Sequence, residues 1–171
     1  MNLNTWFEKA DLIARKVKSI GHTEENKKFA ASAEEAFELL RSQIDMKSPV
    51  MILEETEGSI TGSNNDNLRD YPLFTFSIVQ NYQLNNFLEK AQALDNCKKV
   101  GMEIFALLLQ WKTQGFSGDA SYKAFVGFDP GSIKYEETLP IYDNATGFTF
   151  SFTITTGTYL FYDPELYNDT E

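Results

Sequence analysis

Histidine and cysteine are nearly missing from this chain of 171 residues, which contains one of each, His22 and Cys97. A lone cysteine cannot form an intramolecular disulfide, and tetrahedral zinc sites need several Cys or His ligands. Catalytic triads and dyads need a proton shuttle, usually an imidazole. His22 follows Gly21 at a predicted turn, where we expect it to be solvated or to cap a helix end. The sequence therefore indicates neither a zinc site nor a nucleophilic hydrolase.

The glycine motifs that cradle phosphate or present a nucleophilic serine are also absent, so nucleotide binding has no anchor. The run 64–67 and Asp70 offer oxygens to calcium but lack the regular spacing and terminal Glu of an EF-hand loop. Adjacent acids such as Glu34–Glu35, Glu54–Glu55 and Glu136–Glu137 could include a catalytic pair. Neighbours in a strand point to opposite faces, so surface solubility explains such pairs better than catalysis. We assign no catalytic, cofactor-binding or metal-binding residue and expect a non-enzymatic protein.

Basic residues are scarce, since 15 Lys and Arg face 25 Asp and Glu, giving a formal net charge of −10. Such a charge repels phosphate and anionic lipid, so we expect neither specific nucleic-acid binding nor membrane binding. The opening MNLNTWFEKADLIARKVK has acids and bases throughout and no continuous apolar stretch. It is expected to be neither a signal peptide nor a membrane span, so the protein stays where it is made.

Aromatic residues, in contrast, are abundant: the chain has 14 Phe and 8 Tyr, and its hydrophobic fraction is 42%. A chain this apolar folds, and its length lies within the range of one domain, so we expect residues 1–171 to form a single domain. An aromatic core accounts for most of this count, and contact surfaces for a partner are the alternative.

The first third predicts a helical hairpin. Thr5 and Glu8 have the spacing of a capping box, and Gly21 suits the left-handed stop of the first helix. The apolar stripe of that helix is Trp6, Ala10, Ile13, Ala14 and Val17. A second helix is predicted after Thr23, and its apolar stripe is Phe29, Ala33, Phe37, Leu40 and Ile44.

The middle of the chain predicts a β-hairpin and then a long helix. A strand from Val50 to about Thr56, a polar loop over Gly58–Asp70 and a strand over Leu73–Val79 form the hairpin. Asn86, with Glu89 three residues later, is expected to cap the helix. Its predicted buried stripe is Phe87, Leu88, Ala91, Leu94, Cys97, Gly101, Ile104, Phe105, Leu108 and Trp111. Gly101 indicates either a close backbone approach or a tolerated surface glycine.

The last third is cut into short pieces by Gly and Pro, so we expect strands and no helix there. In Phe148–Thr155 the alternation places three Phe and one Ile on one face and hydroxyl residues on the other. Ile133–Tyr142 is a second candidate strand, and Tyr159–Tyr162 extends the last one. The element order predicts an α+β fold: an antiparallel or mixed sheet with an N-terminal helical hairpin and one long helix packed on one face.

This arrangement resembles the phage tail-terminator and head–tail joining (neck, tail-completion) proteins. The segments that carry the resemblance are TWFEKADLIARKVKSIGHTEENKKFAASAEEAFELLRS, SPVMILEETEGSITGSNNDNLRDYPLFTFSIVQ, the long helix and FTFSFTIT. It implies a non-enzymatic virion protein, made in the host cytoplasm, that forms a homo-oligomeric ring, often a hexamer, and contacts neighbouring tail or neck proteins. It also implies a use for the acidity, because a ring through which DNA slides should not grip phosphate.

Two other functions are consistent with the sequence. A monomeric acidic module of the inhibitor or immunity type would cover a basic partner by charge complementarity. An enzyme would use carboxylates in a cleft floored by the sheet.

Overall fold

The computed structural model describes residues 3–32, 46–54, 56–61, 68–138 and 144–157. The elements in chain order are α1 (Leu3–Lys16), β1 (Phe29–Ala30), β2 (Val50–Leu53), β3 (Glu57–Thr61), β4 (Arg69–Asn81), α3 (Phe87–Phe116), the 3-10 helix η2 (Ala120–Phe125), β5 (Phe128–Glu137), β6 (Ala145–Ile154) and β7 (Thr156–Gly157). The fold is α+β, as predicted.

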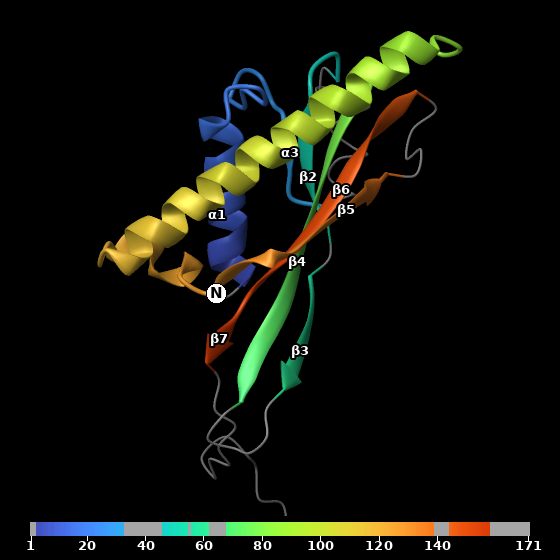
Figure 1. Cartoon of the computed structure of the whole chain (residues 1–171). Helices are drawn as coiled ribbons and strands as arrows, with labels where there is room; N and C mark the ends of the chain where they lie inside the picture. The colour runs from blue at the N-terminus through green and yellow to red at the C-terminus, as the bar shows by residue number, and fades with distance from the viewer. Residues whose placement is uncertain (1–2, 33–45, 55, 62–67, 139–143, 158–171) are drawn as a thin grey trace, which may run out of the picture.

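The strands form one mixed sheet organised around β4, which has 13 residues. The order across the main part is β1-β2-β4-β6-β5, and β3 and β7 pair with the first half of β4. β1 runs parallel to β2, and the other pairings are antiparallel. Figure 1 shows β4 running the length of the molecule, with α1 and α3 beside only part of it.

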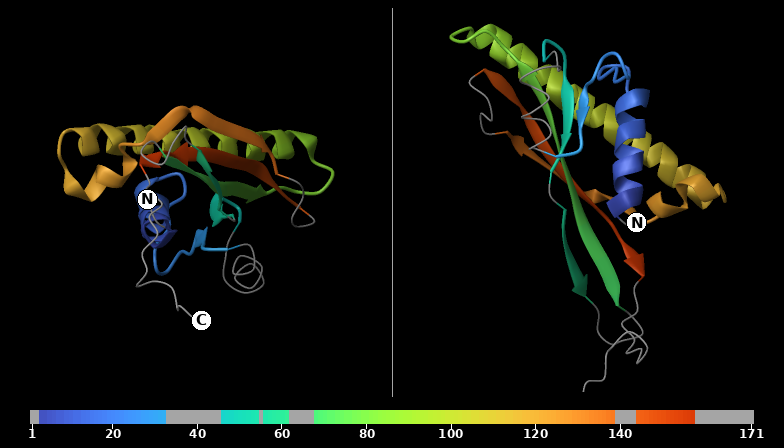
Figure 2. Two further views of the ribbon diagram at one scale, coloured as in Figure 1. Left: turned by 90° about the horizontal axis from the view of Figure 1, so that it is seen from below. Right: turned by 180° about the vertical axis from the view of Figure 1, so that it is seen from behind.

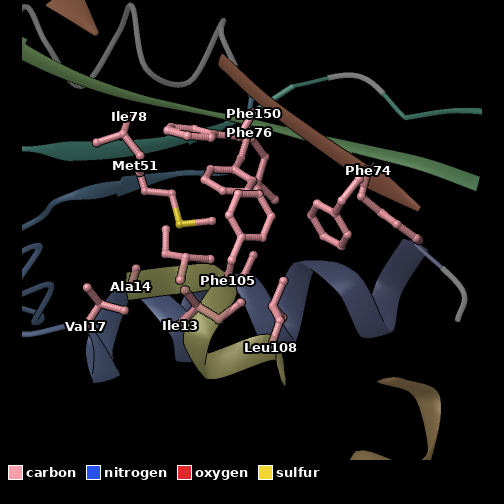
Figure 3. Close-up of a cluster of buried hydrophobic side chains, with 14 of the residues drawn as sticks. Ile13, Ala14, Val17, Met51, Phe74, Phe76, Ile78, Phe105, Leu108 and Phe150 are labelled. Carbon is pink, nitrogen blue, oxygen red and sulfur yellow. The ribbon is translucent and has the colours of Figure 1, made fainter. Parts of the chain in front are cut away.

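Both helices cover the same face of the sheet, and the main core lies between them and the strands. Even-numbered residues of β4 and β6 point into it: Phe74, Phe76, Ile78, Phe150, Phe152 and Ile154. Trp6 of α1 belongs to the same cluster. Ile13 of α1 and Phe105 and Leu108 of α3 meet the strand residues from the helical side (Figure 3). The alternation predicted for these two strands is therefore confirmed, since these six side chains are at most 1% exposed.

The predicted helical hairpin is only partly found. α1 begins at Leu3, so Thr5 lies inside the helix and not at its start, and the capping box was wrong. Gly21 does have a positive φ, 68°, five residues beyond the end of the helix. Phe29 belongs to a strand that pairs with Met51 and not to a second helix, and residues 33–45 lie outside the described part.

The predicted hairpin is confirmed in its pairing but not in its loop. β2 and β4 are antiparallel, with Met51 opposite Ile78, although β2 ends at Leu53 and not near Thr56. The predicted loop over Gly58–Asp70 was wrong at both ends. Glu57–Thr61 is β3, and β4 already begins at Arg69, while residues 62–67 lie outside the described part.

The cap of α3 is confirmed, because Asn86 Oδ1 accepts a hydrogen bond from Glu89 N at 3.1 Å. The stripe is confirmed from Cys97 onward, and Leu94 before it is half-buried. It was wrong at its first three positions: Phe87 and Leu88 are 85% and 79% exposed, and Ala91 is exposed. The buried residues of α3 begin at Ala93, so the first turn of the helix does not contribute to the core.

The last third contains one element that the glycine spacing did not predict. η2 is a 3-10 helix capped by Asp119, whose Oδ1 accepts from Ser121 N at 2.9 Å. It packs Phe125 on Trp111 with ring centroids 4.9 Å apart, so an aromatic contact holds the turn. β5 begins at Phe128, five residues before the predicted start, and its predicted end lies outside the described residues, as does Tyr159–Tyr162.

Candidate functional site

One end of the sheet forms an arm, which we define as β3, β7 and Arg69–Leu73 of β4. β3 and β7 flank this half of β4 on opposite edges, where Ser59 pairs with Tyr71 and Thr156 pairs with Asp70. In Figures 1 and 2 the arm extends past α1 and α3, which cover the other half of the sheet. All five residues of β3 are exposed, Ile60 to 50%.

The arm begins where β4 changes partners on one edge. β6 pairs with β4 as far as Thr153, opposite Leu73, and β7 resumes at Thr156, opposite Asp70. Between them lies Pro72, which has no N–H to donate, and Thr155 instead donates its N–H to Gly127 O at 2.9 Å. The ladder is thus interrupted at the position where a proline can be accommodated, and the arm continues beyond it.

A strand paired on one edge only presents a row of backbone N–H and C=O groups to solvent. Among the described strands, four are paired on one edge only: β1 with β2, β3 and β7 with β4, and β5 with β6. Of these, β3 and β5 lie on opposite sides of the sheet. The arrangement offers contact by strand addition and side-chain packing.

His22, the one candidate base, links helix α1 to the segment that precedes β1. Its side chain is 9% exposed, so the expectation of a solvated turn histidine was wrong. Nδ1 accepts from Lys28 N at 3.0 Å and Nε2 lies 3.3 Å from Asp11 Oδ1, so both ring nitrogens are engaged and α1 is joined to the segment leading into β1.

Asp11 also contacts Arg15, whose other partner is Glu24 at 2.6 Å. This hydrogen bond from Arg15 lowers the pKa of the Glu24 carboxyl. Both side chains are exposed enough for solvent to screen the pair, which limits its effect on stability.

A hydroxyl network crosses the other face of the sheet. Ser77 Oγ donates to Glu54 Oε1 at 2.6 Å and lies 2.8 Å from Thr149 Oγ1, which is 3.2 Å from Thr138 Oγ1. Ser77 is fully buried and has no imidazole beside it, so the network joins neighbouring strands and does not generate a nucleophile.

The acids considered from sequence do not converge in the described part. Glu136 and Glu137 are exposed neighbours on β5, and Glu137 pairs with Lys90 at 3.1 Å. Asp70 lies on the arm, whereas residues 64–67 lie outside the described part, as do Glu55 and the pair Glu34–Glu35. Within the described ranges, no three His, Cys, Asp or Glu side chains gather as metal ligands would.

No protein-family model, curated protein or solved structure matches this chain. The helices in the described part include none with the length and apolar character needed to cross a bilayer. The features that bear on function are therefore the surfaces of the chain itself, and the arm is one that extends past the helices (Figure 1).

Cys97 is a buried packing residue, as predicted. Its side chain is 0% exposed, and Sγ lies 3.8 Å from Thr146 O. Burial raises the pKa of the Cys97 thiol to about 12, so the nucleophilic thiolate is scarce in the folded protein.

This burial predicts a pH-dependent loss of stability. The unfolded thiol ionises from about pH 8.5, whereas the folded thiol stays protonated to about pH 12, so the free energy of unfolding should fall by up to about 1.4 kcal/mol per pH unit in between. Urea unfolding at pH 8 and pH 10 should show the stability advantage of the natural chain over Cys97→Ala shrinking. Parallel losses in the two proteins, or rapid alkylation of the native thiol, would contradict the prediction.

Proposed function

We propose that this chain is a non-enzymatic structural subunit of a phage or phage-like neck or tail assembly. In this proposal it is a virion protein that forms a homo-oligomeric ring at the tail end or the head–tail junction. The observation that carries the proposal is the arm, which projects from the helix-covered part of the sheet with β3 exposed along its length (Figure 1). A projecting β arm suits contact with a neighbouring subunit.

The open edges of β3 and β5 support a ring over a closed pair. A contact between two different surfaces of the same chain is heterologous, and such contacts generate rings when the rotation closes. β3 and β5 are different edges on opposite sides of one sheet, so an arm that reaches the β5 side of its neighbour leaves its own β5 edge for the next subunit. Hexamers are the frequent form in the proteins that the sequence resembles.

The charge supports the same proposal. A net charge of −10 disfavours a grip on the phosphates of DNA passing through a ring. A continuous basic strip along the lumen of an assembled ring would contradict this part of the proposal.

The test is the mass and shape of the assembled chain. Multi-angle light scattering and negative-stain imaging of the purified protein should show closed rings. Ile60→Lys should abolish them, because it places a charge on the exposed strand β3. Phe7→Lys, at a 41% exposed position on α1, should leave them intact. A strictly monomeric protein at high concentration, or rings equally sensitive to both changes, would refute the proposed role of the arm.

The competing proposal is a monomeric acidic module that covers a basic partner, for which the same net charge is the supporting observation. It predicts monomers by light scattering and an association with a basic protein that weakens as salt rises. Binding that is indifferent to salt would remove its basis.

A further inference from the structure

The outer face of α3 carries apolar residues at seven-residue spacing. The residues of α3 that face the core are buried, whereas Leu88, Met102, Leu109 and Phe116 are 79%, 40%, 43% and 65% exposed. Positions seven residues apart on an α-helix differ by about 20° around the axis, so the drift over the four heptads from Leu88 to Phe116 is about 80°. These four side chains therefore form one slanted stripe along the outer side of α3. We call it the outer stripe.

The outer stripe is symmetric about its middle. Met102 lies 14 residues after Leu88 and 14 before Phe116, and the most exposed members are those at the two ends. Phe87, at 85% exposure, adds to the first end. A helix that is apolar on all sides is normally buried, and the stretch from Met102 to Trp111 approaches that pattern.

We propose that α3 pairs antiparallel with α3 of a second copy of this chain, with the twofold axis passing by Met102. This register places Leu88 against Phe116 of the second copy, at both ends of the pair, and Met102 against its own counterpart. Each exposed apolar end of α3 is thereby covered by the opposite end of α3 in the second copy.

The charges beside the outer stripe fit this register. Lys99 and Glu103 lie on the same flank of it, three residues before and one residue after Met102, so an antiparallel pair brings Lys99 within about 3 Å, measured along the axis, of Glu103 of the second copy. α3 as a whole has four Lys and three acids, a charge of +1, so the rest of the chain carries −11. Two copies of an acidic chain therefore repel least where their α3 helices meet.

The size of the contact sets the strength of the pair. The 28 steps from Leu88 to Phe116 extend about 42 Å, and a strip about 10 Å wide covers roughly 400 Å² on each copy. The two copies together therefore bury roughly 800 Å², which is below the roughly 1,000 Å² expected of a stable interface. The pair should accordingly dissociate on dilution. Asp95, at the same seven-residue spacing, faces Leu109 of the second copy and weakens the contact further.

Disulfide trapping tests the register, because the single natural thiol is buried. Met102→Cys should form a covalent dimer under mild oxidation at least about tenfold faster than Gln110→Cys. Gln110 is an exposed position on the same helix, and its two copies would lie about 24 Å apart along the axis. Equal rates at the two positions, or no dimer from Met102→Cys, would overturn the proposal.

Sedimentation velocity over a concentration series tests the energetics. Asp95→Leu should lower the dissociation constant of the pair by about tenfold or more, and Met102→Glu should raise it similarly, with circular dichroism confirming that both variants fold. Unchanged constants would overturn the proposal. The pair does not depend on the ring: rings without a Met102→Cys cross-link would refute the pair alone, and cross-linked dimers without rings would refute the ring alone.

Discussion

Phe152→Ala is expected to lower the free energy of unfolding by about 3–5 kcal/mol, the usual cost of removing a buried Phe side chain. Phe152 is fully buried on β6, and its ring contacts five other rings with centroids 5.4–6.3 Å away. They are Trp6, Phe74, Phe76, Phe105 and Phe128. These rings come from α1, β4, α3 and β5, so one truncation leaves a cavity where both helices meet the sheet.

Urea unfolding followed by circular dichroism measures this loss, and Phe148→Ala is the matched control. Phe148 lies on the same strand and the same face but is only half-buried, near Tyr135 and Phe150. Its truncation should cost about half as much or less, because less apolar surface returns to water. Equal losses at the two positions would show that the core is not centred on Phe152.

The two central strands could be predicted from sequence because their signals are local. β6 and the second half of β4 alternate between apolar and hydroxyl residues, so their buried faces follow from a period of two. The α3 cap is equally local, since Asn86 and Glu89 are three residues apart and bond each other in the structure.

β3 could not be predicted in this way, and neither could the arm to which it belongs. Glu57-Gly58-Ser59-Ile60-Thr61 contains one large apolar residue and is exposed throughout, so burial leaves no periodic pattern in it. β3 is a strand because Arg69–Leu73 lies alongside it, a pairing that its own composition does not indicate. The surface on which the functional proposal depends is thus specified by a partner strand and not by a motif.

The wrong assignment of Phe29 to a helix has a comparable cause. Its spacing to Ala33 and Phe37 fits a helix, but a parallel pairing with Met51, 22 residues away, places Phe29–Ala30 in the sheet. The exposed start of α3 shows the converse. Its helical period was correct, but a period cannot reveal at which turn of the helix burial begins.

Gly101→Ala should lower the free energy of unfolding by about 2 kcal/mol, although alanine is the better helix former by about 1 kcal/mol. A Cβ at Gly101 would lie 2.1 Å from Cζ and 2.5 Å from Cε1 of Phe150, a fully buried ring. Of the two alternatives left by the sequence, close backbone approach is therefore correct. Relieving the overlap requires moving either α3 or the ring, and overpacking of this kind typically costs 1–3 kcal/mol.

A double-mutant cycle with Phe150→Leu separates this clash from a general intolerance of α3 to substitution. The shorter side chain removes the ring atoms that the new Cβ would meet, so Gly101→Ala should cost at least 1 kcal/mol less in the Phe150→Leu background than in the natural chain. Unfolding curves of the four proteins in urea give this coupling free energy. Additive losses would mean that Gly101 is required for some reason other than the approach of β6, and the packing of α3 against the centre of the sheet would then need a different explanation.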